Sequence, residues 1–239
     1  MKNGGYMTAV LFDVDDTLYE RKVPFVKAYK EIFGGRYQVP AEGLYESNCR
    51  HSDEVFELSR TGAMSMRDMY IYRIQKAFQD FDICIGEAEA LAFQEAYAKH
   101  QKKLDLAEGM REVLSLCRDR GIAMGIITNG PSDHQWEKIR TLGADAWIPK
   151  ENIFISGDVG AAKPDVSVFQ LAEKSMGLSG EAVYFIGDSY KNDVEGAKKA
   201  GWIPIWLNRS GRKPEEEEAA CYVADSGKAL YCLLKTILP

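Results

Sequence analysis

Short runs of apolar residues recur along the chain and alternate with segments whose apolar residues fall at helical spacing. A short apolar run bounded by polar residues or glycine is typical of a buried strand. Such runs lie at residues 9–12, 122–127, 153–155, 182–186 and 203–207, with a weaker one at 221–223. Helical patterns cover residues 110–120, 164–176, 193–200 and 226–238. Strands that alternate with helices predict an α/β fold class with a doubly wound parallel sheet.

The segment between Leu18 and Leu104 differs, because it contains no convincing strand pattern. Apolar residues at helical spacing indicate amphipathic helices near residues 25–33, 66–81 and 87–103. We therefore expect an all-helical domain of residues 19–104, inserted into a core domain of residues 1–18 and 105–239. An insertion directly after the first strand is a suitable place for a lid over a site at the end of that strand.

Composition supports a globular protein and excludes some partners. Hydrophobic residues make up 46% of the 239 residues, which is enough for a sizeable core. The formal net charge of -6 argues against nucleic acid as a binding partner. No apolar run reaches the length of a signal peptide or of a membrane span. The five cysteines form no CxxC pair, which favours reduced, buried thiols and a cytoplasmic location. The oligomeric state is left open by the sequence.

The first predicted strand ends in an acidic segment that runs from Asp13 to Thr17. Chemistry in open α/β sheets occurs outside the carboxyl ends of the strands. Asp13 and Asp15 point to the same side if the strand geometry continues, because side chains alternate with a period of two. One carboxylate can then attack an electrophile while the other transfers protons or supports a metal. The alternative is an acidic loop that caps a helix.

Later strands are also followed by polar groups. Thr128 and Asn129 can hold phosphate oxygens through a hydroxyl and backbone N–H groups, but they also suit an ordinary turn. Lys163 stands before a proline and is by itself compatible with a surface position. Asp188 and Asp193 follow the strongest strand and suit Mg²⁺, although Asp193 can equally cap the next helix.

Taken in order, these positions resemble the four motifs of the haloacid dehalogenase-like (HAD) hydrolase superfamily. They are the segment 13–17, Thr128, Lys163 with the following proline, and the segment 187–193. The resemblance spans the whole chain, and the helical insertion resembles the family's C1 cap. It implies a Rossmann-like core and a phosphatase acting on a small phosphorylated metabolite, such as a nucleotide or sugar phosphate.

The resemblance also implies a role for each motif residue. Asp13 is the expected nucleophile, and Asp15 is the expected acid and base for the leaving group and the water. Thr128, the backbone N–H of Asn129, and Lys163 are expected to bind the phosphate. Mg²⁺ is expected to be held by carboxylates and by the backbone carbonyl of Asp15; the carboxylates are those of Asp13, Asp188 and, directly or through water, Asp193.

Other members of the superfamily remain alternatives. Its dehalogenases lack the second acid of the first motif, which is present here as Asp15. Its phosphomutases usually carry valine or isoleucine where this chain has Thr17, and its phosphonatases need a cap lysine that nothing here singles out. Receiver domains share the phosphorylated aspartate but are about half as long. These comparisons favour a phosphatase.

Overall fold

The computed structural model describes residues 8–178, 182–212 and 222–239. The chain divides into two compact units: Met1–Glu20 with Asp105–Pro239 form one, and Arg21–Leu104 form the other. The acidic run 215–218, and Cys221 at the start of the weak predicted strand, lie outside the described residues. Among the described residues, no helix is long and apolar enough to cross a membrane.

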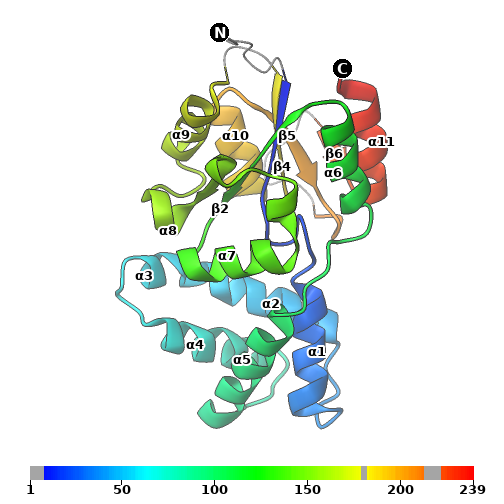
Figure 1. Ribbon diagram of the computed structural model, residues 1–239. Helices are drawn as coiled ribbons and strands as arrows, with labels where there is room; N and C mark the ends of the chain where they lie inside the picture. The colour runs from blue at the N-terminus through cyan, green and yellow to red at the C-terminus, as the bar shows by residue number, and fades with distance from the viewer. Residues whose placement is uncertain (1–7, 179–181, 213–221) are drawn as a thin grey trace. The chain divides into compact units, whose positions relative to one another are not determined.

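The first unit is built on a six-stranded parallel sheet, which confirms the predicted α/β fold class (Figure 1). The strand order is β3-β2-β1-β4-β5-β6, so the first strand of the sequence lies in the interior of the sheet. The strands are β1 (Thr8–Phe12), β2 (Ala123–Thr128), β3 (Ile153–Ile155), β4 (Ala182–Gly187), β5 (Ile203–Leu207) and β6 (Tyr222–Ala224). Because all are parallel, their carboxyl ends meet at one edge of the sheet.

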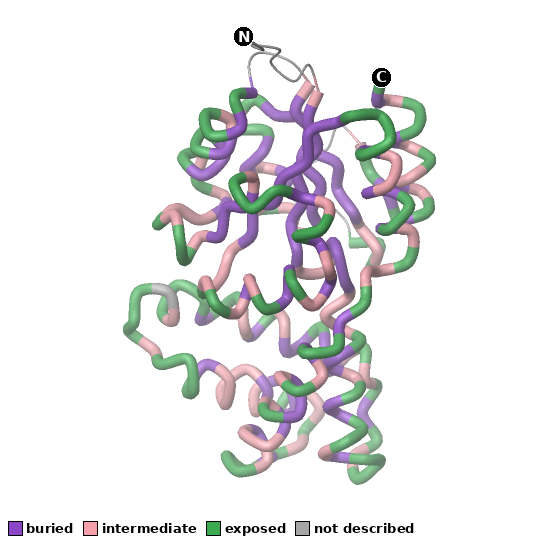
Figure 2. Tube along the Cα trace, in the orientation of Figure 1, coloured by how far each residue is buried: buried purple, intermediate pink, exposed green. Residues whose placement is uncertain are grey.

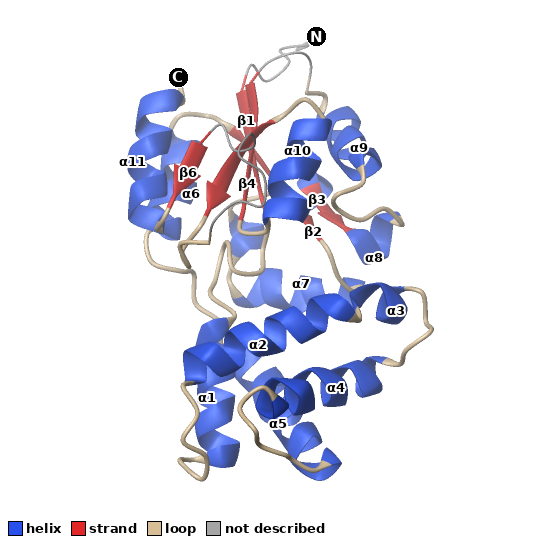
Figure 3. Ribbon diagram, turned by 180° about the vertical axis from the view of Figure 1, so that it is seen from behind, coloured by secondary structure: helices blue, strands red, loops and turns tan. Residues whose placement is uncertain are grey.

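Helices cover both faces of this sheet, as a doubly wound topology requires (Figure 3). One face carries α9 (Val166–Met176) and α10 (Gly196–Lys199), and the other carries α6 (Met110–Asp119) and α11 (Gly227–Ile237). On the first face, Phe169 packs edge-on against Phe185 and Trp202, with ring centroids 5.3 Å apart in both pairs. The sheet strands are therefore buried almost throughout (Figure 2).

Two predicted helices begin differently from the expectation. The helix expected from residue 164 begins at Val166, because Asp165 is its N-cap and accepts a hydrogen bond from the Ser167 N–H. The helix expected over 193–200 is replaced by a π-helical turn, η3 (Tyr190–Glu195), which continues into α10. Ser189, not Asp193, caps this turn by accepting the Asn192 N–H.

The sequence pattern missed several short elements of the first unit. They are α7 (Ser132–Thr141), α8 (Ser156–Val159) and the 3₁₀ turns η1 (Ala144–Ala146) and η2 (Lys150–Asn152). In α7 two of the buried side chains are polar, Gln135 and Lys138, so the helix shows only a weak apolar stripe.

The second unit is entirely helical among its described residues. It contains α1 (Lys22–Phe33), α2 (Ala41–Glu54), α3 (Phe56–Arg60), α4 (Met66–Gln79) and α5 (Glu87–Gln101). Its core is aromatic: Phe33 packs against Phe78 with ring centroids 4.8 Å apart, and Phe25 against Phe93 at 5.0 Å. The pattern did not predict α2, because its buried face includes the polar residues Ser47, Asn48 and His51.

The expectation of buried cysteines is wrong for two of the four described residues. Cys117 is buried on α6, and Cys49 is partly buried. Cys84 and Cys232 are exposed. All four carry free thiols.

Candidate active site

The nucleophile candidate Asp13 directly follows β1 and extends the hydrogen bonding of the sheet. Its N–H donates to the carbonyl of Ile186 on β4 at 2.9 Å. The chain then turns sharply at Asp16, whose φ of 56° lies in the left-handed region. Arg209, which follows β5, donates to the carbonyls of Asp16 and Thr17, the latter at 3.1 Å. These contacts hold the acidic segment at the carboxyl edge of the sheet.

A buried lysine lies between two of the predicted acids. Lys163 Nζ lies 2.7 Å from Asp13 Oδ1 and 2.7 Å from Asp193 Oδ1, and all three side chains are buried. The Asn129 side chain fixes the backbone of Lys163, because it donates to the Lys163 carbonyl at 2.8 Å and accepts the Lys163 N–H at 2.9 Å. The side chain of Asn129, in the turn after β2, thus positions Lys163. The sequence predicts a role only for the backbone N–H of Asn129.

Burial and neighbouring charge oppose each other at Asp13. Burial raises the pKa of its carboxyl to about 7, and the charges of Asp193 and Asp15 add to the rise, while Lys163 counteracts it. Burial alone lowers the pKa of Lys163, but the two carboxylates hold that pKa above its usual value. Lys163 therefore stays charged. The Asp13 carboxylate needs more positive charge nearby than Lys163 supplies.

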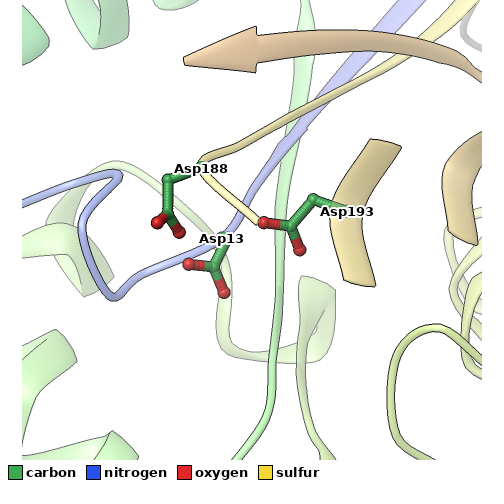
Figure 4. A group of neighbouring side chains, drawn as sticks. All are labelled: Asp13, Asp188 and Asp193. Atoms are coloured by element: carbon green, nitrogen blue, oxygen red, sulfur yellow. The ribbon is translucent and has the colours of Figure 1, made fainter. Parts of the chain in front are cut away.

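Three carboxyl groups converge at this point and form a possible cation site. One oxygen from each of Asp13, Asp188 and Asp193 lies within 4.8 Å of the others (Figure 4). All the donors are carboxylate oxygens, which are the ligands that Mg²⁺ prefers. Since the pKa of Asp13 is raised, a bound cation would stabilise its ionised form. The residues present therefore fit a divalent metal ion.

Close packing at the end of β4 brings Asp193 into this group. A Cβ atom added at Gly187 would lie 2.2 Å from Asp193 Oδ2, so only glycine allows this approach. The same oxygen accepts the Ser189 N–H at 2.9 Å. The Asp193 side chain thus closes the turn after β4 instead of capping a helix, and its other oxygen faces Lys163.

Thr128 ends β2 with its side chain buried. Its hydroxyl oxygen has no hydrogen-bond partner among the described residues. A buried hydroxyl without a partner costs free energy unless a ligand or water satisfies it. Thr128 is therefore available to bind an oxygen atom of a ligand, and its contact with phosphate stays a prediction.

Asp15 lies in a different environment from Asp13. Lys138 Nζ lies 2.8 Å from both oxygens of the Asp15 carboxylate, and Gln135 Nε2 donates to Oδ2 at 3.0 Å. The Tyr19 hydroxyl donates to Oδ1. Gln135 and Lys138 were not predicted from the sequence, because its apolar pattern does not indicate α7. The two polar residues are three positions apart on one face of a helix, just after the turn that carries Thr128. This spacing is the sequence signal that could have identified them.

The raised pKa of Asp13 predicts a pH-dependent stability in the absence of metal. The folded protein keeps the Asp13 proton up to about pH 7, whereas the unfolded chain releases it near 3.8. Between these values the folded state binds more protons, so its stability falls as the pH rises. We expect Asp13→Asn, which cannot ionise, to melt above the wild type at pH 8 in EDTA, by about 2–4 °C for each kcal/mol regained.

The same variant should differ little from the wild type at pH 4, where Asp13 is protonated in the folded protein. Thermal melts followed by circular dichroism at both pH values measure this, with the exposed Asp145→Asn as the control. An equal difference at pH 4 and pH 8 would contradict the role of Asp13 ionisation.

The chain is similar to known proteins over most of its length. The family model described as haloacid dehalogenase-like hydrolase matches residues 7–201. The chain is 35% identical to a phosphoserine phosphatase of Thermus thermophilus, over 90% of this chain and 93% of that protein. It is 27% identical to a glyceraldehyde 3-phosphate phosphatase of Methanopyrus kandleri, over 84% of each.

Solved structures show the same fold. The putative HAD-hydrolase YfnB of Bacillus subtilis, in a structure described as bound to magnesium, superposes with a TM-score of 0.70 at 23% identity, and the match covers 96% of this chain and 99% of that one. The family model and the relatives both extend over most of the sequence. The chain therefore belongs to the haloacid dehalogenase-like hydrolase family.

Proposed function

We propose that the protein is a Mg²⁺-dependent phosphatase that hydrolyses a small phosphomonoester through a phosphorylated Asp13. The observation that carries this proposal is the arrangement around Asp13. Its carboxylate contacts the buried Lys163 and lies in a cluster of three acids at the carboxyl edge of the sheet. Phosphatase relatives that match most of the chain support the same activity.

In the first step an oxygen of Asp13 attacks phosphorus, and the bond from phosphorus to the ester oxygen breaks. Asp15 donates its proton to that oxygen, so the alcohol leaves neutral. In the second step Asp15 removes a proton from water, and the water oxygen attacks phosphorus and releases phosphate from Asp13. Thr128 and the Asn129 N–H bind phosphate oxygens in both steps.

Positive charge is needed because both reactants are anions. Two like unit charges about 4 Å apart repel by roughly 4 kcal/mol at an effective dielectric constant near 20. Lys163 offsets part of this repulsion at Asp13. Mg²⁺, held by Asp13, Asp188, the carbonyl of Asp15 and, directly or through water, Asp193, would neutralise charge on the phosphate oxygens.

The substrates of two of the relatives differ in one charged group. Phosphoserine carries a carboxylate, whereas glyceraldehyde 3-phosphate does not. The 35% identity to a phosphoserine phosphatase supports a phosphorylated amino acid or hydroxy acid over the nucleotide or sugar phosphate that the sequence motifs first favoured.

Hydrolysis of p-nitrophenyl phosphate tests the proposed reaction directly. We expect activity with Mg²⁺ and none in EDTA or with Asp13→Asn, because the nucleophile or its supporting charge is then missing. Lys163→Ala should retain less than about a tenth of the wild-type kcat, since it removes a cation beside the developing charge. Lys174→Ala on α9, which removes an exposed lysine, is the control. Substantial turnover by Asp13→Asn would refute the phosphoenzyme.

The metal site can be tested without turnover. Mg²⁺ binding to the folded protein should raise the Tm with increasing Mg²⁺ concentration, because a ligand of the native state stabilises it. Asp188→Asn should abolish most of this shift. Asp188 suits the test better than Asp193, which also pairs with Lys163. The exposed Asp145→Asn should retain the full shift, and a full shift in Asp188→Asn would remove Asp188 from the site.

A further inference from the structure

We propose that Lys138 and Gln135 are positioning residues that hold the Asp15 carboxylate in place for proton transfer. The inference rests on the proposed function, in which Asp15 is the acid and base. It adds two residues of α7 that lie outside the four sequence motifs.

The contacts fix both oxygens of the carboxylate. Lys138 Nζ is equidistant from Oδ1 and Oδ2, at 2.8 Å from each, and Gln135 donates to Oδ2 at 3.0 Å. Tyr19 donates to Oδ1. Donors on both oxygens prevent the carboxyl group from rotating, which a single contact on one oxygen would not do.

The two α7 residues are themselves well ordered by burial. Lys138 is 4% exposed and Gln135 is 2% exposed, although both are polar. A buried ammonium is costly unless a carboxylate compensates it, and Asp15 provides that carboxylate. Lys138 also offsets the negative charge of Asp15, which would otherwise repel Asp13 and an anionic phosphate.

Gln135 connects Asp15 to the predicted phosphate-binding turn. Its side-chain amide donates both to Asp15 and to the carbonyl of Asn129, the latter at 2.9 Å. Asn129 in turn binds the backbone of Lys163. A Cβ atom at Gly130 would lie 2.6 Å from Gln135 Nε2, so glycine at this turn leaves room for the amide. One amide group therefore sets the distance between Asp15 and the turn that carries Thr128.

Correct placement of Asp15 matters most when the leaving group is a poor one. An alkyl phosphate such as phosphoserine releases a strongly basic alkoxide, which needs a proton as the bond breaks. p-Nitrophenyl phosphate releases a weakly basic phenolate that leaves without one. A misplaced acid should therefore slow phosphoryl transfer from the alkyl ester much more than from the aryl ester.

The experiment compares kcat/KM for phosphoserine and p-nitrophenyl phosphate by release of inorganic phosphate. This ratio reports the steps up to phosphorylation of Asp13 and thus isolates the acid role. We expect Lys138→Met to lower it about 10- to 100-fold for phosphoserine, within the usual contribution of general acid catalysis, and no more than about threefold for the aryl ester. Gln135→Met should change both values in the same directions but less.

Matched variants separate positioning from simple structural damage. Lys138→Arg should restore part of the loss, because it retains the cation. Arg140→Met, which removes an exposed cation from the same helix, should behave as the wild type. Tm measurements show whether each variant folds, and Asp15→Asn defines the selectivity expected when the acid is lost.

Equal losses for both esters in Lys138→Met, or no loss for either, would overturn the inference while Asp15→Asn still shows the selective loss. A faster Lys138→Met would overturn it too, because the ion pair would then restrain Asp15 from reacting. If Asp15→Asn itself shows no selectivity, the acid role of Asp15 fails, and the proposed function must be revised first.

Discussion

The first unit depends on one buried electrostatic arrangement, in which Lys163 lies between the carboxylates of Asp13 and Asp193. Each of these charges would be costly in the protein interior by itself. Lys163 offsets the charge of both carboxylates, whereas the two carboxylates repel each other. The lysine follows β3 and α8, Asp13 follows β1, and Asp193 follows β4, so the arrangement forms only when the part of the sheet from β3 to β4 has assembled. The fold and the site are therefore specified by the same contacts.

The single positive charge of Lys163 does not balance the carboxylates of Asp13 and Asp193, and this imbalance indicates what the site is suited to bind. Burial raises the pKa of Asp13 to about 7 even though Lys163 contacts it. A site built only for stability would gain from removing one carboxylate. Three carboxylates converging on one point are instead a natural feature of a site that receives a divalent cation and an anionic ligand together.

Much of the fold was predictable because its strands are short apolar runs ended by polar residues or glycine, and the polar residues at those ends mark the carboxyl edge. The positions of Asp13, Thr128 and Asp188 at this edge follow from that pattern and from parallel topology, whereas Lys163 was assigned to the site only through the resemblance to the family. Helix α7 was not predictable in the same way, since its buried face carries Gln135 and Lys138. Those residues are buried because Asp15 binds them, and a hydrophobicity pattern cannot register a long-range polar contact.

The two acids of the first motif show how neighbouring carboxylates acquire different chemistry. Asp13 is buried at the sheet edge, where desolvation dominates and Lys163 is shared with Asp193. Asp15, two residues later, has its own lysine together with an amide and a phenol. A nucleophile needs an unhindered oxygen and nearby positive charge, whereas a proton donor needs a fixed orientation toward the leaving group. The sharp turn at Asp16, held by Arg209, separates the two environments and so gives Asp13 and Asp15 the different surroundings that their proposed roles require.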